Sequence, residues 1–208
     1  MKIRWAGHAQ FVIQTAGKTI VTDPPAPSYG YPAVPEHADI VTVSHEHGDH
    51  NAVETLSGNP QILRGTGAHT IGDITLTGYP SFHDPEHGTL RGENTIFRIQ
   101  AENLNLVHLG DLGETLTDEQ IQALGPVDIL MIPIGSVYTI DAEEAFALVQ
   151  RIQPKIVLPM HYMTPYLSFT LDPSEKFIQK FDEVLYRPFV EVSAGHLPQT
   201  MQVILLTL

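Results

Sequence analysis

The segment that most constrains this chain is a buried-strand pattern that runs directly into a cluster of polar side chains. Asp39–Ser44 (DIVTVS) is mostly β-branched and apolar, which is typical of a strand buried on both faces. The next residues, His45–His50, read HEHGDH. In extended backbone, residues two apart point to the same side, so His45 and His47 can bind one cation together.

The second half of this cluster offers further ligands. Gly48 allows the chain to turn sharply, and Asp49 and His50 then face a second position nearby. Imidazoles and a carboxylate packed this closely suit Zn²⁺, which accepts nitrogen and oxygen ligands. The chain contains no cysteine, so disulfides and thiolate sites are excluded and a metal must be bound by His, Asp or Glu. The sequence therefore predicts a metal site directly after a buried strand.

Strand and helix patterns alternate along the rest of the chain, which favours an α/β (α+β) fold with two packed sheets and helices outside them. No internal repeat, low-complexity tract or linker divides the sequence, so we expect one domain over residues 1–208. The expected strands are Lys2–Ala6, Gln10–Ala16, Lys18–Asp23, Asp39–Ser44, Ile74–Tyr79, Thr95–Gln100, Leu104–Leu109, Ile129–Ile134, Ile156–Pro159 and Met201–Leu206.

Four expected helices begin with a start signal, in which a capping residue is followed three positions later by Glu or Gln. The third is the clearest, because the apolar residues of Ala142–Ile152 recur at the spacing of one buried helix face. The start pairs are Asn51 with Glu54, Thr117 with Gln120, Asp141 with Glu144, and Asp172 with Glu175.

The charge of the chain argues against nucleic acid as a partner. Asp and Glu number 24 against 11 Lys and Arg, which gives a formal net charge of −13, and no Lys/Arg cluster is present. The first residues contain no apolar run of signal length, and no stretch reaches the ~18 apolar residues of a membrane span. We therefore expect a cytoplasmic protein without a membrane span that acts on a small molecule.

The motif HEHGDH resembles the HxHxDH signature of the metallo-β-lactamase superfamily. That family places an Asp upstream of the signature, and a third His, an Asp after a strand and a last His downstream of it. This chain has Asp23, His83, Asp111 and His161 in that order, so the resemblance covers nearly its whole length. The resemblance implies an αββα sandwich, the metallo-β-lactamase fold, with the site at one edge between the sheets.

Shorter stretches narrow the resemblance to a subgroup. WAGHAQFVI near the start, a DP after the third strand, GDLG and PMHY resemble the ascorbate-6-phosphate lactonases and the phospholipase D that cleaves N-acyl phosphatidylethanolamine. Both of those proteins are longer than this chain. The resemblance therefore implies the class of reaction, but it does not imply that this chain acts on either of their substrates.

The same resemblance implies a dinuclear site in which Asp111 bridges two divalent ions. Class B1 β-lactamases have a Cys where Asp111 stands, which argues against antibiotic hydrolysis. Zn²⁺ is the expected metal, and Mn²⁺ or Fe²⁺ would also fit such ligands. Asp23 would support the ligands without binding metal. The implied ligands are His45, His47 and His83 for the first ion, and Asp49, His50 and His161 for the second.

A site of this kind predicts hydrolysis by a metal-activated water. Two ions about 3.5–4 Å apart can share one water and lower its pKa from 15.7 towards about 7, which supplies a hydroxide nucleophile. Asp49 would orient it or take its proton. We expect cleavage of a lactone, ester or phosphodiester of a small molecule.

Three alternatives stay open. The first is a phosphodiesterase or nuclease acting on RNA, as in tRNA 3′-end processing, against which the acidic balance weighs. The second is a diiron oxidoreductase-type site, although diiron flavoproteins need a further domain. The third is a non-catalytic metal-binding module, against which the complete ligand set argues.

The sequence allows two possible roles for several other residues. His8, in the first hairpin, either borders the site or makes a structural hydrogen bond. His87 either contacts substrate or lies on the surface, and Tyr138 and Tyr162 are candidates for hydrogen bonds to substrate. His108 is expected to be packed, and His37, His69 and His196 to be structural or exposed. The loops 24–37, 84–94 and 163–172 are expected to shape the pocket.

Overall fold

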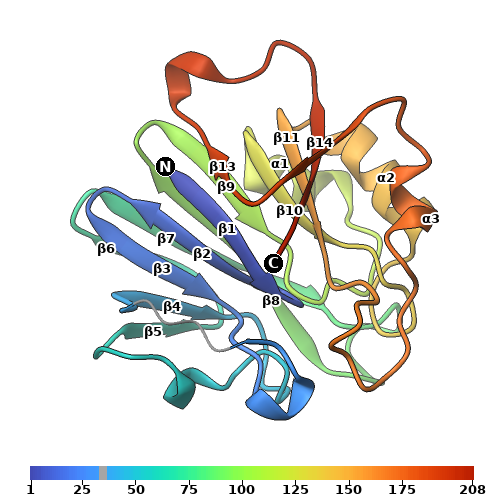
Figure 1. The fold of residues 1–208 in the computed structure, drawn as a ribbon, viewed down its shortest axis with the longest axis horizontal. Coiled ribbons are helices and arrows are strands. Elements are labelled where there is room, and N and C mark those ends of the chain that lie inside the picture. Colours follow the sequence, from blue (N-terminus) through green and yellow to red (C-terminus); the bar gives the residue numbers. More distant parts are fainter. Residues whose placement is uncertain (33–36) are drawn as a thin grey trace.

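The strands form two sheets that pack against each other with the main apolar core between them (Figure 1). The computed structural model describes residues 1–32 and 37–208. The first sheet has six strands in the order β13-β1-β2-β3-β4-β5, with β4 and β5 added in parallel to an antiparallel group. Their bounds are β1 Lys2–Gly7, β2 Gln10–Thr15, β3 Lys18–Thr22, β4 Ile40–Val43, β5 Gln61–Arg64 and β13 Val190–Glu191.

The second sheet has eight strands in the order β12-β14-β11-β10-β9-β8-β7-β6. Strands β6 to β9 are antiparallel neighbours, and the pairs from β9 to β12 are parallel. Their bounds are β6 Gly67–Ile71, β7 Ile74–Phe82, β8 Glu93–Ala101, β9 Leu104–His108, β10 Ile129–Pro133, β11 Ile156–Met160, β12 Val184–Arg187 and β14 Gln202–Leu206.

Side chains of the six-stranded sheet alternate between its two faces, as the period of a strand requires. Phe11 and Ile13 of β2 belong to the core between the sheets. Val12, between them, belongs to a smaller apolar cluster on the outer face, against which Val53 and Leu56 pack. Both faces of this sheet are therefore covered, which explains why all four residues of β4 are buried and mostly apolar.

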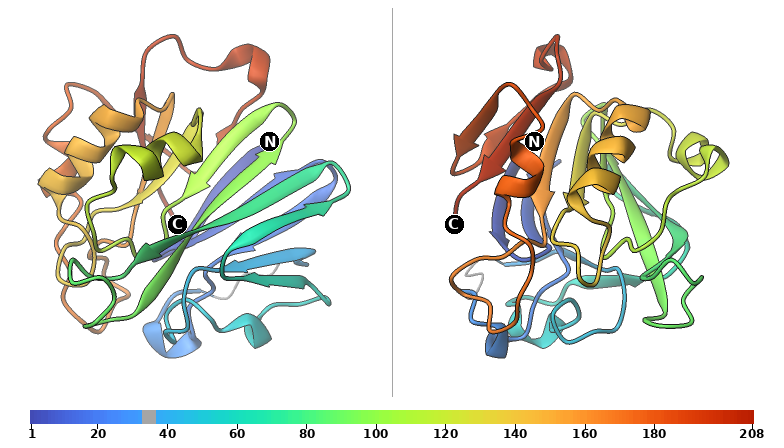
Figure 2. Two further views of the ribbon diagram at one scale, coloured as in Figure 1. Left: turned by 180° about the vertical axis from the view of Figure 1, so that it is seen from behind. Right: turned by 90° about the vertical axis from the view of Figure 1, so that its right-hand side faces the viewer.

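The expected two-sheet sandwich is confirmed, and its two outer faces differ in how helices cover them. Figure 2 shows α1 and α2 on the outer side of the eight-stranded sheet. The outer face of the other sheet is covered by the segment around a 3₁₀ turn, η2, instead of a long helix. No helix in the described ranges is long and apolar enough to cross a bilayer. The bounds are α1 Asp118–Leu124, α2 Ala142–Ile152, α3 Glu175–Ile178, η1 Pro27–Tyr29, η2 Val53–Thr55 and η3 Ala194–His196.

Two of the four expected helix starts are confirmed as capping boxes, those of α1 at Thr117 and of α2 at Asp141. The prediction at Asn51 is wrong, because its side-chain amide donates to Glu46 Oε2 at 3.1 Å and leaves η2 without a side-chain cap. The prediction at Asp172 is also wrong. Its carboxylate pairs with Lys176 at 2.8 Å, and α3 is a single turn without a side-chain cap.

Four strands were not predicted from the sequence, and they are β5, β6, β12 and β13. They lie at the edges of the two sheets, and every residue of β6 is exposed or half-buried. An edge strand of this kind lacks the apolar alternation that marks a strand in the sequence. Backbone hydrogen bonds to a neighbour that is already extended impose the strand conformation instead.

Candidate metal centre

The predicted site residues follow the ends of strands from both sheets. His45–His50 follows β4, and His8 follows β1, both in the six-stranded sheet. In the eight-stranded sheet, His83 follows β7, Asp111 comes shortly after β9, and His161 follows β11. Strand β7 extends beyond its predicted end at Tyr79 to Phe82, which brings His83 to the same edge.

Asp111 lies at the centre of the cluster, and its side chain is almost completely buried. Its Oδ2 atom is surrounded by the Nε2 atoms of imidazoles from three different segments. The distances are 3.1 Å to His50, 3.2 Å to His161, 3.4 Å to His83 and 3.8 Å to His45. One carboxylate oxygen thus contacts both of the predicted ligand groups, as a bridging residue would.

The remaining predicted ligands complete two groups around Asp111. His47 is exposed, and its ring centroid lies 4.6 Å from that of His45 and 5.1 Å from that of His83. Asp49 Oδ2 lies 3.7 Å from His50 Nε2. In the groups His45/His47/His83 and His8/Asp49/His50/His161, the potential ligand atoms lie within 4.8 Å of one another. The structure therefore brings all seven predicted ligands together and adds His8.

Asp23 fixes the orientation of two of these imidazoles. His50 Nδ1 lies 3.1 Å from Asp23 Oδ2, and because a carboxylate only accepts, His50 carries its proton on Nδ1. The Ser44 hydroxyl donates to Asp23 Oδ2 at 2.6 Å and lies 2.9 Å from His45 Nδ1, so His45 donates to the hydroxyl. In both rings Nδ1 makes the supporting hydrogen bond, which leaves Nε2 as the atom that can coordinate a metal.

Several buried polar atoms in the cluster have no hydrogen-bond partner among the described residues. They include Nε2 of His45, Nε2 of His50 and Oδ1 of Asp111. Buried polar atoms are normally paired, and leaving one unpaired costs about 1–3 kcal/mol. Free lone pairs that converge on one carboxylate are the donor set that a divalent cation such as Zn²⁺ would satisfy.

The electrostatics of the cluster also favour bound cations. Burial opposes the charged form of His50, but the negative charge of Asp111, 3.1 Å from His50 Nε2, and the hydrogen bond to Asp23 outweigh it and raise its pKa well above the usual range. The same negative charge that favours a proton at His50 Nε2 would favour a metal cation in its place. His45 shows the opposite balance, because burial and the charge of His50 lower its pKa to about 3. His45 is therefore neutral at pH 7 and free to coordinate.

His8 makes the hydrogen bond that the sequence left open, and its partner belongs to the cluster. His8 Nε2 lies 3.1 Å from Asp49 Oδ2, and its ring centroid lies 4.1 Å from that of His161. Burial, followed by the charge of His161, lowers the pKa of His8 to about 4, so the ring is neutral and donates to Asp49. His8 therefore holds Asp49 in place.

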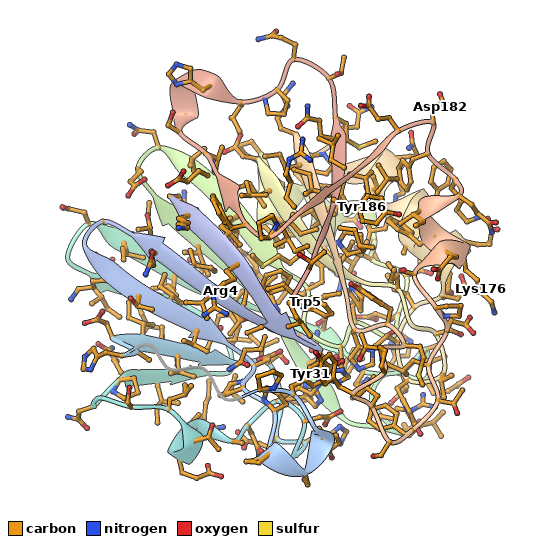
Figure 3. All side chains as sticks on the ribbon, in the orientation of Figure 1. Arg4, Trp5, Tyr31, Lys176, Asp182 and Tyr186 are labelled. Carbon is orange, nitrogen blue, oxygen red and sulfur yellow. The ribbon has the colours of Figure 1, made fainter. Side chains whose placement is uncertain are left out.

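An aromatic group supports the turn that carries His8. The indole of Trp5 donates to the carbonyl of His8 at 2.9 Å and stacks on Tyr162 with centroids 5.2 Å apart. Figure 3 shows Trp5 and Tyr31 close together at this end of β1, with ring centroids 6.4 Å apart. Gly7 has φ +109°, and a Cβ there would lie 2.1 Å from Tyr31, so only glycine fits.

Three residues of this site have strained backbone conformations. His8, Asp23 and His161 have positive φ values of 53°, 38° and 52°, which non-glycine residues rarely adopt. Each such residue costs on the order of 1–3 kcal/mol, which the surrounding contacts must offset. The backbone N–H of His161 donates to the carbonyl of His8 at 3.1 Å and links two of the strained positions.

Asn94 and Asp84 position the residues that come from the eight-stranded sheet. Asn94 accepts from the backbone N–H of Asp111 at 2.9 Å and donates to the carbonyl of Leu109 at 2.9 Å. Asp84, directly after His83, accepts from the N–H groups of Glu86, Gly88, Leu90 and Arg91. These hydrogen bonds lower the pKa of Asp84, although desolvation opposes the shift. Neither residue stood out in the sequence, since Asn and Asp are common in turns.

A cavity of about 500 Å³ opens over the cluster, within the range typical of small-molecule sites. His47, Asp49, His83, Asp111 and His161 contribute to its lining. Aromatic side chains form another part of the lining, and they are Tyr29, Tyr138 and Phe169. Of the pocket-shaping loops expected from the sequence, 24–37 contributes Tyr29, but its residues 33–36 lie outside the described part of the chain.

The other singled-out residues lie outside this cavity, except Tyr138. His108 is packed as expected, and its Nε2 donates to the carbonyl of Ala9 at 2.8 Å. Tyr162 is buried against Trp5 and is absent from the cavity lining. His37, His69 and His196 are exposed, as expected. His87 is also exposed, which agrees with the interpretation that it lies on the surface.

Comparisons with known proteins agree with this geometry. A family described as a beta-lactamase superfamily domain matches residues 2–161. A protein of Pyrococcus abyssi is 34% identical over 188 residues, which cover 79% of this chain and 84% of the relative. A metal-dependent hydrolase of Pyrobaculum arsenaticum is 29% identical over 196 residues, covering 79% and 85%. A Thermotoga maritima structure, assigned to the metallo-beta-lactamase superfamily, is 36% identical with a TM-score of 0.84, covering 99% and 97%.

Proposed function

Because this chain belongs to the metallo-β-lactamase superfamily and is a metal-dependent hydrolase, we propose that its cluster binds two divalent ions and cleaves a small molecule. The proposed bond is a lactone, ester or phosphodiester. The observation that carries the proposal is the arrangement of four imidazole nitrogens 3.1–3.8 Å from one oxygen of Asp111. Zn²⁺ is the proposed metal, in line with its nitrogen and oxygen ligand preference.

The proposed assignment divides the ligands between the two groups seen in the structure. The first ion would be bound by His45, His47 and His83, and the second by Asp49, His50 and His161. Asp111 would bridge them. Ions at these positions would lower the pKa of a bound water and polarise the carbonyl or phosphoryl oxygen of the substrate.

The side chains of this protein account for the rest of the proposed chemistry. Asp49 borders the cavity and is partly exposed, so it can accept the proton of the attacking water. Burial opposes its charged form, but the hydrogen bond from His8 and the charge of His50 keep its pKa below the usual range. Asp49 is therefore ionised at pH 7. His8 positions it, and Asp23 keeps His45 and His50 in the tautomer that coordinates.

The test combines metal analysis with a panel of lactones, aryl esters and aryl phosphodiesters on metal-reconstituted protein. His47→Ala and Asp49→Ala should lose bound metal and at least about 100-fold in turnover, which is the scale expected when the activating group is disturbed. His69→Ala is the matched control, because His69 is exposed on β6 and should change neither quantity. Full turnover in a metal-free variant would end the proposal.

The same preparation separates the alternatives. Iron with visible absorption bands, in place of colourless zinc, would favour a diiron oxidoreductase-type site. RNA cleavage together with RNA binding at low salt would favour a nuclease, although the net charge of −13 opposes that outcome. Stoichiometric zinc without turnover on any substrate class would favour a metal-binding module.

A further inference from the structure

Among the described residues, Arg91 is the one Lys or Arg that lines the cavity over the metal cluster. Arg91 also lines an adjoining cavity of about 370 Å³, so it lies between the two spaces. Arg64 and Arg151 pair with the carboxylates of Glu46 and Asp118, whereas Arg91 has no carboxylate partner among the described residues. Arg98 and Arg187 are also recorded without a carboxylate partner, but neither of them lines the cavity over the cluster.

The guanidinium of Arg91 is held in position by neutral contacts. It donates to the carbonyl of Val137 at 3.2 Å and lies 5.6 Å from the centroid of the Tyr138 ring. Val137 has φ +46°, which is a strained conformation for a β-branched residue. The backbone N–H of Arg91 donates to Asp84 at 2.7 Å, directly after His83. The position of Arg91 is therefore coupled to the cluster, while its guanidinium makes no ion pair with a carboxylate of the described residues.

Beside Arg91, three aromatic side chains form one continuous wall of the cavity. Phe169 contacts Tyr138 and Tyr29 edge to face, with ring centroids 5.9 Å and 6.0 Å apart. All three rings are partly exposed, although apolar rings are normally covered where nothing binds to them. The ring of Phe169 also lies 6.0 Å from that of His8, so the wall reaches the metal cluster.

We propose that Arg91 binds an anionic group of the substrate while an aromatic or flat apolar part of the same molecule lies on the wall of Tyr29, Phe169 and Tyr138. A planar guanidinium binds a carboxylate or phosphate through two parallel hydrogen bonds, and aromatic walls favour flat partners. The substrate class is thus a small hydrolysable aromatic or planar acid. This inference rests on the proposed function, because it takes the metal cluster as the reacting centre.

The test measures binding of two fluorinated probes by ¹⁹F NMR, on the zinc-loaded protein and after chelation. The probes are 4-fluorophenylacetate and its neutral analogue 4-fluorophenylacetamide. Arg91→Gln should weaken binding of the acid at least about tenfold in both preparations and leave the amide within about twofold. Arg91→Lys keeps the charge without the planar fork and should lose about threefold to fivefold. Phe169→Ala should weaken both probes to a similar extent.

Arg187→Gln is the matched control, because Arg187 also donates to a backbone carbonyl and lines a different cavity. It should leave both probes unaffected. Equal losses for acid and amide in Arg91→Gln, or no loss at all, would overturn the proposal. Phenyl phosphate and inorganic phosphate as competitors decide between a carboxylate and a phosphate as the natural anion.

The outcome for Arg91 can be separated from the outcome for hydrolysis. If the zinc-loaded protein cleaves nothing in the substrate panel but the acid still binds through Arg91, the proposed function fails and the anion site stands. If cleavage depends on the metal but acid and neutral substrates respond alike to Arg91→Gln, the hydrolase stands and the anion site is refuted.

Discussion

Replacing Asp23 by Asn should weaken metal binding about 100-fold without unfolding the protein. The buried carboxylate of Asp23 accepts from His50 directly and from His45 through the hydroxyl of Ser44. An amide of the same shape can donate to His50 Nδ1, which moves the ring proton to Nε2 and removes the lone pair that faces Asp111. Asn tolerates the φ of +38° at this position, so no backbone strain is added.

The magnitude follows from the number of imidazoles that Asp23 orients. Loss of a residue that orients one metal ligand typically costs 10–100-fold in affinity. Two imidazoles at about tenfold each give about 100-fold, or roughly 2.7 kcal/mol. Ser44→Ala breaks only the contact to His45 and should cost about tenfold, which provides an internal comparison.

The assay is competition for Zn²⁺ with a chromophoric chelator, at pH 7, with thermal unfolding of the metal-free proteins as a control for folding. Affinity of Asp23→Asn within about threefold of the parent, in a folded protein, would refute the reasoning about tautomers. So would a larger loss in Ser44→Ala than in Asp23→Asn.

Two further predictions concern the turn after β1. Gly7→Ala should destabilise the protein by about 2–4 kcal/mol in urea unfolding, because its Cβ would meet Tyr31 at 2.1 Å and its φ is +109°, and a loss under about 1 kcal/mol would contradict this. The pKa of His8 is lowered to about 4 in the folded protein, against an ordinary value of 6.5. Between these two pH values the unfolded chain binds a proton at His8 and the folded chain does not, so the free energy of unfolding falls as the pH drops. His8→Gln in metal-free protein should therefore remove about 2 kcal/mol of the change in unfolding free energy between pH 7 and pH 5, and an unchanged pH profile would count against a neutral, buried His8.

The sequence predicted the strands that deliver the cluster because those strands are buried. Strands β4 and β11 are buried along their whole length and mostly apolar, and His45 and His161 lie just beyond their ends. The structure brings these residues to one carboxylate, Asp111, as the ordered motifs indicated. A buried apolar segment of this kind can be recognised as a strand from sequence alone. The residue that follows the segment then lies at the edge of the sheet.

Other parts of the site could not be predicted from local sequence. The contact of His8 with Asp49 joins residues 41 positions apart, and although Gly7 indicates a turn before His8, nothing in the local sequence identifies Asp49 as its partner. Arg91 belongs to a loop whose shape is set by Asp84 accepting four backbone N–H groups. Such features follow from the packing of the two sheets, and the edge strands β6 and β12 went undetected for a related reason.

Each of the two proposed ligand groups draws residues from both sheets. His45 and His47 meet His83 across the interface, and Asp49 and His50 meet His161. An ion in either group would therefore join the two sheets, as a crosslink does. Metal binding would therefore stabilise the packing of the two sheets, and free ion at 100 times its dissociation constant would add about 2.7 kcal/mol to the free energy of unfolding. When the ion is scarce, the protein would lose this stabilisation, unfold more often and be cleaved faster by proteases.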